Sequence, residues 1–113
     1  MNSKEIAAQL KILSSVKDRT LWRLRINDLL NNANLSEVIK AYQEIIAGGL
    51  KVAEVLSTVH LTDEQQETIK KAVQENFFGE NLVFVFNVDP GMEKALRIKV
   101  DDNILELGTK LNL

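Results

Sequence analysis

Few side chains in this sequence have the chemistry that catalysis requires. Histidine, which titrates nearest neutral pH, occurs once, as His60, and its place between an apolar segment and a helix start indicates an exposed linker residue. Cysteine is absent, which excludes disulfides and thiolate metal sites. The paired carboxylates Asp63-Glu64 and Asp101-Asp102 suit a helix N-terminus and a turn. We therefore expect no catalytic residue, metal site or cofactor.

Composition excludes several other classes of function. The sequence has neither the Gly-x-x-x-x-Gly-Lys nor the Gly-x-Gly-x-x-Gly pattern of nucleotide-binding loops. Its formal net charge is −2, with basic and acidic residues interspersed, which argues against a nucleic-acid partner. No apolar run approaches the roughly 20 residues that cross a bilayer. Any membrane association is therefore expected to be peripheral, which leaves protein binding as the main class of function.

A capped helix is the best-defined element of the chain. The Thr62 hydroxyl can accept a hydrogen bond from the first backbone N–H groups of a helix, and Gln65 has the spacing that completes a capping box. The helix is therefore predicted to start near Asp63. Gly79 and Asn81 indicate a turn after it, before the β-branched and aromatic run at residues 82–86.

The first 48 residues have helical periodicity. Asn2 with Glu5 and Asn34 with Glu37 have the capping-box spacing, and Gly48-Gly49 gives a C-terminal stop. Because no Gly or Pro precedes Gly48, residues 3–31 could form one long helix or two helices hinged near Asp18, and we favour two. Residues 1–48 are thus predicted to be an N-terminal helical region.

Residues 50–113 are predicted to form a small β-α-β-β domain. Strands are expected at residues 51–59 and 82–88, on either side of the capped helix. Apolar and basic residues then alternate over 96–100, and a hairpin tip at 101–103 leads into a last strand at 104–107. The fold class is therefore α/β (α+β), with two to three N-terminal helices followed by this domain.

The apolar residues exceed what one helix can cover. The surplus is either covered by the N-terminal helices or binds an amphipathic helix of a partner. Sequence alone does not separate core from interface for these positions. The partner-binding candidates are Ile39, Tyr42, Ile46, Phe84, Phe86, Ile6, Leu10 and Leu13.

Residues 22–113 resemble the C-terminal part of the delta subunit of F-type ATP synthases, called the oligomycin-sensitivity-conferring protein in mitochondria. The resemblance rests on four pieces in the family's order and spacing: Leu29-Leu30-Asn31-Asn32-Ala33-Asn34-Leu35, the strand at 52–59, Leu61-Thr62-Asp63-Glu64-Gln65, and Asn87-Val88-Asp89-Pro90. The last hairpin follows the family less closely. There only Asp102 and the apolar positions match.

The resemblance implies a non-catalytic peripheral-stalk subunit that holds the helices of stalk subunit b. Typical members begin with a six-helix bundle that grips the catalytic head, whereas here only two helices precede the matching region. Subunits of the catalytic head are therefore only a possible second partner. Three explanations of the short N-terminal region stay open: a truncated chain, a naturally reduced stator subunit, or a partner that supplies the missing helices. The implied location is a peripheral membrane complex, on the cytoplasmic face of a bacterial inner membrane or the inner side of a mitochondrial or plastid membrane.

Two other hypotheses remain. The first is a free-standing adaptor or regulatory domain outside the synthase. The second is a small enzyme, which the scarcity of titratable groups disfavours most.

Overall fold

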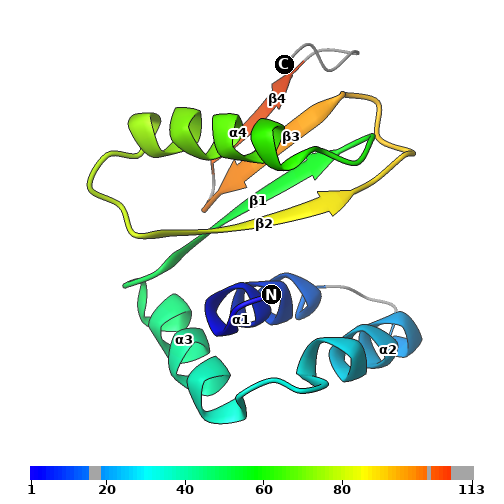
Figure 1. The fold of residues 1–113 in the computed structure, drawn as a ribbon, viewed down its shortest axis with the longest axis vertical. Coiled ribbons are helices and arrows are strands. Elements are labelled where there is room, and N and C mark those ends of the chain that lie inside the picture. Colours follow the sequence, from blue (N-terminus) through cyan, green and yellow to red (C-terminus); the bar gives the residue numbers. More distant parts are fainter. Residues whose placement is uncertain (16–18, 102, 108–113) are drawn as a thin grey trace. The chain divides into compact units, whose positions relative to one another are not determined.

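The computed structural model describes residues 1–15, 19–101 and 103–107. Within them the chain forms four helices and one mixed four-stranded sheet (Figure 1), which confirms the predicted α/β class. Three helices come first, and a β-α-β-β arrangement follows. Contacts divide the chain into two compact units, Met1–Leu50 and Lys51–Leu113.

The first unit consists of helices α1 (Ser3–Leu13), α2 (Arg19–Leu30) and α3 (Leu35–Ala47). The two-helix interpretation of the N-terminal segment is therefore confirmed, although the proposed hinge at Asp18 lies outside the described residues. Gly48 ends α3 with a positive φ of 86°, a conformation that glycine adopts at little cost.

The starts of α1 and α3 are held by side-chain caps. In α1, Asn2 accepts from the Glu5 backbone N–H (2.8 Å) and Glu5 accepts from the Asn2 N–H (3.2 Å), which completes the predicted capping box. In α3, Asn34 accepts from the Glu37 N–H (3.2 Å), but the Glu37 carboxylate accepts from the Ser3 hydroxyl (3.0 Å). That hydrogen bond joins the first turns of the two helices.

The second unit is built from β1 (Lys51–Ser57), α4 (Asp63–Asn76), β2 (Leu82–Val88), β3 (Leu96–Val100) and β4 (Asn103–Leu107). The strand order is β2-β1-β3-β4. β1 is parallel to β2 and antiparallel to β3, and β3 pairs antiparallel with β4. The first three elements are therefore a β-α-β crossover, to which the last two strands add a hairpin.

β1 ends two residues earlier than the sequence predicts. The Ser57 hydroxyl donates to the Val59 carbonyl (2.7 Å), and the Thr58 N–H donates to the Ala95 carbonyl (3.1 Å). The first of these hydrogen bonds is local and turns the chain after Ser57, whereas the second continues the pairing of β1 with the residue before β3. The apolar Val59 therefore lies in the loop before α4, 54% exposed.

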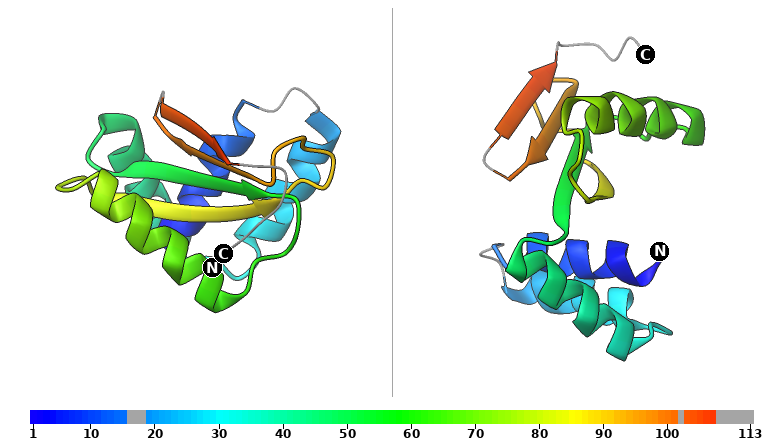
Figure 2. Two further views of the ribbon diagram at one scale, coloured as in Figure 1. Left: turned by 90° about the horizontal axis from the view of Figure 1, so that it is seen from above. Right: turned by 90° about the vertical axis from the view of Figure 1, so that its left-hand side faces the viewer.

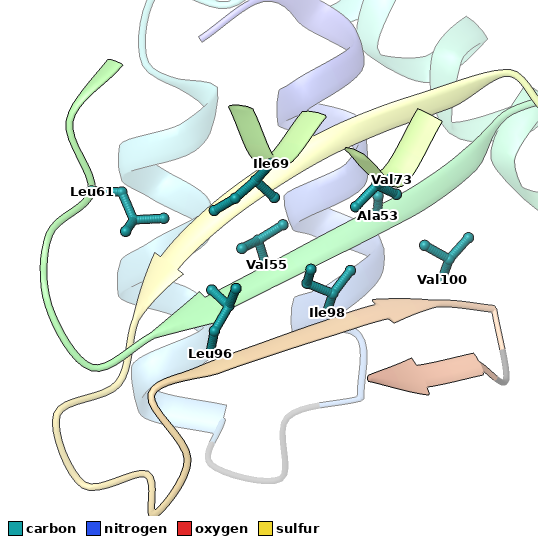
Figure 3. Packing of buried hydrophobic residues seen from close by; sticks show 8 residues of the cluster. All are labelled: Ala53, Val55, Leu61, Ile69, Val73, Leu96, Ile98 and Val100. Carbon is teal, nitrogen blue, oxygen red and sulfur yellow. The ribbon is translucent and has the colours of Figure 1, made fainter. Parts of the chain in front are cut away.

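The core of the second unit lies between α4 and one face of the sheet. Ile69 and Val73 of α4 point at this face (Figure 3). The register places Ala53 and Val55 on it, opposite Phe84 and Phe86 of β2. The buried residues of this core are Ala53, Val55, Leu61, Ile69, Val73, Leu96, Ile98 and Val100. Figure 2 shows α4 lying along one face of the sheet, and no other helix within this unit's described residues covers either face.

The cap of α4 provides a direct test of the helix assignment. The Thr62 hydroxyl accepts from the Gln65 N–H (3.2 Å), and the Gln65 side chain accepts from the Thr62 N–H (2.9 Å). We expect Thr62→Ala to lower the free energy of unfolding by about 1 kcal/mol, because the Gln65 N–H in the first turn of α4 loses its side-chain partner. Urea denaturation followed by circular dichroism measures this change.

Thr68→Ala is the matched control in the same helix. The Thr68 hydroxyl donates to the Glu64 carbonyl (3.0 Å), an in-helix bond that does not favour the helix. Its replacement should leave stability unchanged or raise it slightly. Equal losses in the two variants would contradict a specific capping role for Thr62.

Candidate functional site

The titratable side chains do not form a reactive cluster. His60 is exposed in the loop between β1 and α4. Asp63 and Glu64 lie in the first turn of α4, and Asp101 lies in the turn between β3 and β4 with φ 53°, whereas Asp102 is outside the described residues. Over the described part of the chain, no group of three or more His, Cys, Asp or Glu side chains could hold a metal ion. The candidate site is therefore sought among apolar surfaces.

One sheet face is wider than the helix that covers it. Four strands spaced about 4.8 Å apart span roughly 15 to 19 Å, whereas a helix with its side chains is about 10 to 12 Å across. Because α4 connects the adjacent strands β1 and β2, it lies toward that side of the sheet. The β3–β4 side of the same face is left with apolar side chains, and no second helix covers it among the unit's described residues.

A groove of about 340 Å³ occupies this uncovered area. Its wall is the side of α4 that carries Ala72 and Asn76, and its floor is the hairpin of β3 and β4. All but three of its lining side chains are apolar. They are Thr68, Ile69, Ala72, Val73, Asn76, Phe77, Leu96, Ile98, Val100, Asn103, Ile104, Leu105 and Leu107.

β4 leaves the open side of the groove unprotected. The register places Leu105 opposite Ile98 and Leu107 opposite Leu96, so both side chains lie on the groove face. Leu105 is 53% exposed and Leu107 is 45% exposed. β4 is also an edge strand without proline or lysine, the residues that commonly protect such edges. This combination of an apolar groove and an apolar edge is typical of a protein-binding surface.

A small ion-pair network surrounds Lys51, the first residue of β1. The Lys51 Nζ lies 3.2 Å from a Glu80 carboxylate oxygen and 3.0 Å from an Asp101 carboxylate oxygen. The hydrogen bond to Asp101, and then that to Glu80, raises the pKa of Lys51 above its usual value. The network thereby connects the loop after α4 to the turn between β3 and β4.

The opposite face of the sheet differs in character because it carries charge. Glu54 of β1 lies opposite Lys99 of β3, and Arg97 pairs with Glu106 of β4 (2.8 Å). Burial raises the pKa of Glu54, and the positive charges of Lys99 and Arg97 oppose this effect. The groove face, by contrast, is apolar along the floor and polar only at Thr68, Asn76 and Asn103.

Two of the predicted partner-binding residues, Phe84 and Phe86, lie next to α4. Both rings are half-buried and pack against the core, and their centroids are 6.4 Å apart. The Lys70 Nζ lies 5.8 Å from the centroid of the Phe86 ring. These residues are on the β2 side of α4, and neither lines the groove.

The other candidates lie in the first unit and fall into two groups. Ile6 and Leu13 are buried, and Leu10 and Tyr42 pack against the core that contains Ile6. Ile39 and Ile46 of α3 are 49% and 64% exposed. The structure therefore gives most of this set a core position and leaves the two isoleucines open to a partner.

Sequence reasoning missed the groove residues of β4, Leu105 and Leu107. A usable signal was present, because residues 104–107 are apolar at three of four positions and no helix was predicted after them to cover the hairpin. The missing information was the strand order, which places β4 at the sheet edge, away from β1 and β2.

The fold and the groove define a class: a small α/β module with an uncovered apolar surface beside its helix. A comparison with protein families refines this class, since the family described as ATP synthase delta (OSCP) subunit matches residues 26–113. The chain therefore belongs to the ATP synthase delta (OSCP) subunit family. No curated protein matches the chain.

Family membership has direct consequences for function. It implies that the chain is a peripheral-stalk subunit of F-type ATP synthase. Members of this family are non-catalytic structural subunits that interact with other subunits of the complex. The family also indicates a peripheral membrane complex. Among the described residues, no helix has both the length and the apolar character needed to span a membrane.

The Lys51 network predicts a specific pH dependence of stability. Because the folded-state pKa of Lys51 is raised, its contribution is fully present below the ordinary lysine pKa of about 10.5 and is lost as pH rises through the raised value. We expect Lys51→Met to lower the melting temperature at pH 7, and the difference from wild type to shrink above pH 10.5. Thermal denaturation across this pH range measures both effects.

Lys70→Met is the control for loss of an exposed lysine, since Lys70 pairs with Glu67 one helical turn away (3.3 Å) and otherwise lies over the Phe86 ring at 5.8 Å. Such pairs contribute little. A larger loss of melting temperature from Lys70→Met than from Lys51→Met would show that the network is not the stabilising feature.

Proposed function

We propose that this chain is a stator subunit of an F-type ATP synthase that docks the helices of stalk subunit b and helps the stalk to resist rotor torque. The observation that supports this function best is the groove beside α4. In this role the chain is not itself an enzyme. Residues 1–48 and 50–113 act as two domains, one helical and one β-α-β-β.

A helix is the partner element that suits the groove. The sheet face extends beyond α4 by less than the full width of a helix, so a second helix can rest on this floor while it packs side by side against α4. The small side chain of Ala72 on the α4 wall allows close approach. An amphipathic helix with apolar residues at spacings of three and four would place them on the floor beside Leu105 and Leu107.

The proposed work is mechanical and needs no covalent chemistry. Each Å² of apolar area removed from water contributes about 25 cal/mol, less the cost of association. A stator contact must persist while torque acts on it, so buried apolar area on rigid elements is the appropriate device. Both the helix and the hairpin that form the groove are regular elements of the fold.

The exposed face of α3 is proposed as a second surface for stalk helices. Leu35, Ile39, Tyr42 and Ile46 are spaced four, three and four residues apart, the spacing of a coiled-coil seam. Leu35 is 56% exposed, in addition to the exposed Ile39 and Ile46. Catalytic-head subunits are a further candidate partner for this surface, and the cytoplasmic or organelle inner side of the membrane is the proposed location.

Leu105→Glu tests the groove. The side chain is 53% exposed, so the variant should fold, but a carboxylate on the groove floor would be buried without a partner when a helix binds. We expect at least a tenfold rise in the dissociation constant for purified subunit b of the same synthase, measured by isothermal titration calorimetry.

Val59→Glu is the matched control, because Val59 is equally exposed but lies outside the groove. Ile46→Glu tests the α3 surface in the same assay. Weakened binding in Ile46→Glu with unchanged binding in Leu105→Glu would move the docking site from the groove to α3.

Affinity purification from native membranes tests the assignment to the synthase. The tagged chain should retain subunit b at moderate salt, and recovery of head subunits as well would establish a complete stator contact. Retention of unrelated proteins without any synthase subunit would overturn the proposal and favour the alternative, an adaptor domain that functions outside the synthase.

A further inference from the structure

The groove by itself does not fix the position of a helix along its length. Its floor repeats apolar side chains along two strands: Leu96, Ile98 and Val100 in β3, and Leu105 and Leu107 in β4. A helix shifted by one turn, about 5.4 Å, would meet similar side chains again, since alternate strand residues are about 6.6 Å apart. Affinity can come from the floor, but a fixed register requires a feature that occurs only once.

Such a feature exists at the end of the groove next to the C-terminus of α4. Phe78 is 93% exposed, the most exposed large hydrophobic side chain in the described residues. Its neighbours Asn76 and Phe77 line the groove, as does Asn103 at the start of β4. The two amide side chains of the lining are thus at this end, whereas Thr68, the third polar residue, is two turns earlier on α4.

The loop that presents Phe78 is held in place on both sides. The Glu80 N–H donates to the Phe77 carbonyl (3.0 Å), and the Gln74 side-chain amide donates to the Glu80 carbonyl (3.1 Å). Gly79 permits this turn through its positive φ of 85°. The loop is also joined to β1, because the Lys51 N–H donates to the Asn81 carbonyl (2.8 Å) and the Lys51 ammonium pairs with Glu80.

Single exposed apolar residues are common on protein surfaces and usually need no explanation. Phe78 differs because a large aromatic side chain is presented on a constrained loop next to an uncovered groove. Aromatic residues held in this way bind with little additional loss of conformational entropy.

We propose that Phe78 is the residue that fixes the register of the stalk helix in the groove. Its ring inserts between two apolar side chains of that helix, at the point where the helix also presents a hydrogen-bonding side chain to Asn103. The Asn76 amide N–H donates to the Ala72 carbonyl (2.8 Å), which leaves its carbonyl oxygen as the group that a partner could reach. This inference rests on the proposed function, since it takes the groove to hold a helix of subunit b. It adds a specificity-determining residue that lies outside the groove lining.

Site-specific photocrosslinking tests the register directly. p-Benzoylphenylalanine replaces Phe78 in the full chain, purified subunit b is added, and mass spectrometry maps the crosslinked residues. A fixed register gives crosslinks within one helical turn of subunit b. Crosslinks spread over two or more turns would overturn the inference.

Binding measurements provide a second readout. Phe78→Ala should raise the dissociation constant for subunit b by about 30-fold, the effect typical of an interface hot spot, and Phe78→Leu should restore part of the affinity. Val59→Ala is the control for loss of an exposed apolar side chain in a loop. Because Phe78 is almost fully exposed, its replacement should leave the melting temperature unchanged.

The failures of the two proposals are distinguishable. Normal affinity in Phe78→Ala with weak binding in Leu105→Glu would overturn the role of Phe78 and leave the groove as the docking site. Absence of binding between subunit b and the wild-type chain would overturn the proposed function, and the role of Phe78 with it.

Discussion

The apolar face of the four-stranded sheet is the constraint on which the second unit depends. Five apolar residues of the described strands are buried on this face: Ala53, Val55, Leu96, Ile98 and Val100. These side chains must be removed from water for the unit to be stable. The described residues of this unit supply one helix for this purpose, although the face is wider than one helix. Within the described residues α4 covers the β1–β2 side of this face, and the proposed partner helix would cover the β3–β4 side.

The connection between β1 and β2 decides which part of the face stays open. A short β-α-β crossover places α4 over the two strands that it joins, and the hairpin adds β3 and β4 on the far side of β1. The groove is thus a consequence of topology. The Lys51 network and the turn at Gly79 both follow the C-terminus of α4, next to the groove-lining Asn76 and Phe77. The two ends of the groove therefore differ in structure.

Much of the fold could be predicted from sequence, because the strongest signals were local. Thr62 with Gln65 and Asn2 with Glu5 form the predicted capping boxes, and Gly48 ends α3 in the left-handed conformation. The register also agrees with the predicted alternation in β2 and β3. The end of β1 was not predicted, because it depends on a side-chain hydrogen bond from Ser57 to the Val59 carbonyl, which the apolar pattern of residues 51–59 does not indicate.

The candidate site was harder to predict than the fold, because it depends on which apolar side chains no other element packs against. Leu105 and Leu107 have the same alternation as Ile98 and Val100, yet the latter are buried and the former are half exposed. Only the strand order separates the two pairs, and periodicity contains no information about it. Ile6 illustrates the opposite case, since a helical stripe that suited a partner lies in the core formed with α3. A binding surface of this kind consists of apolar side chains that the rest of the chain does not bury. It can therefore be recognised only when the contacts between the elements are known.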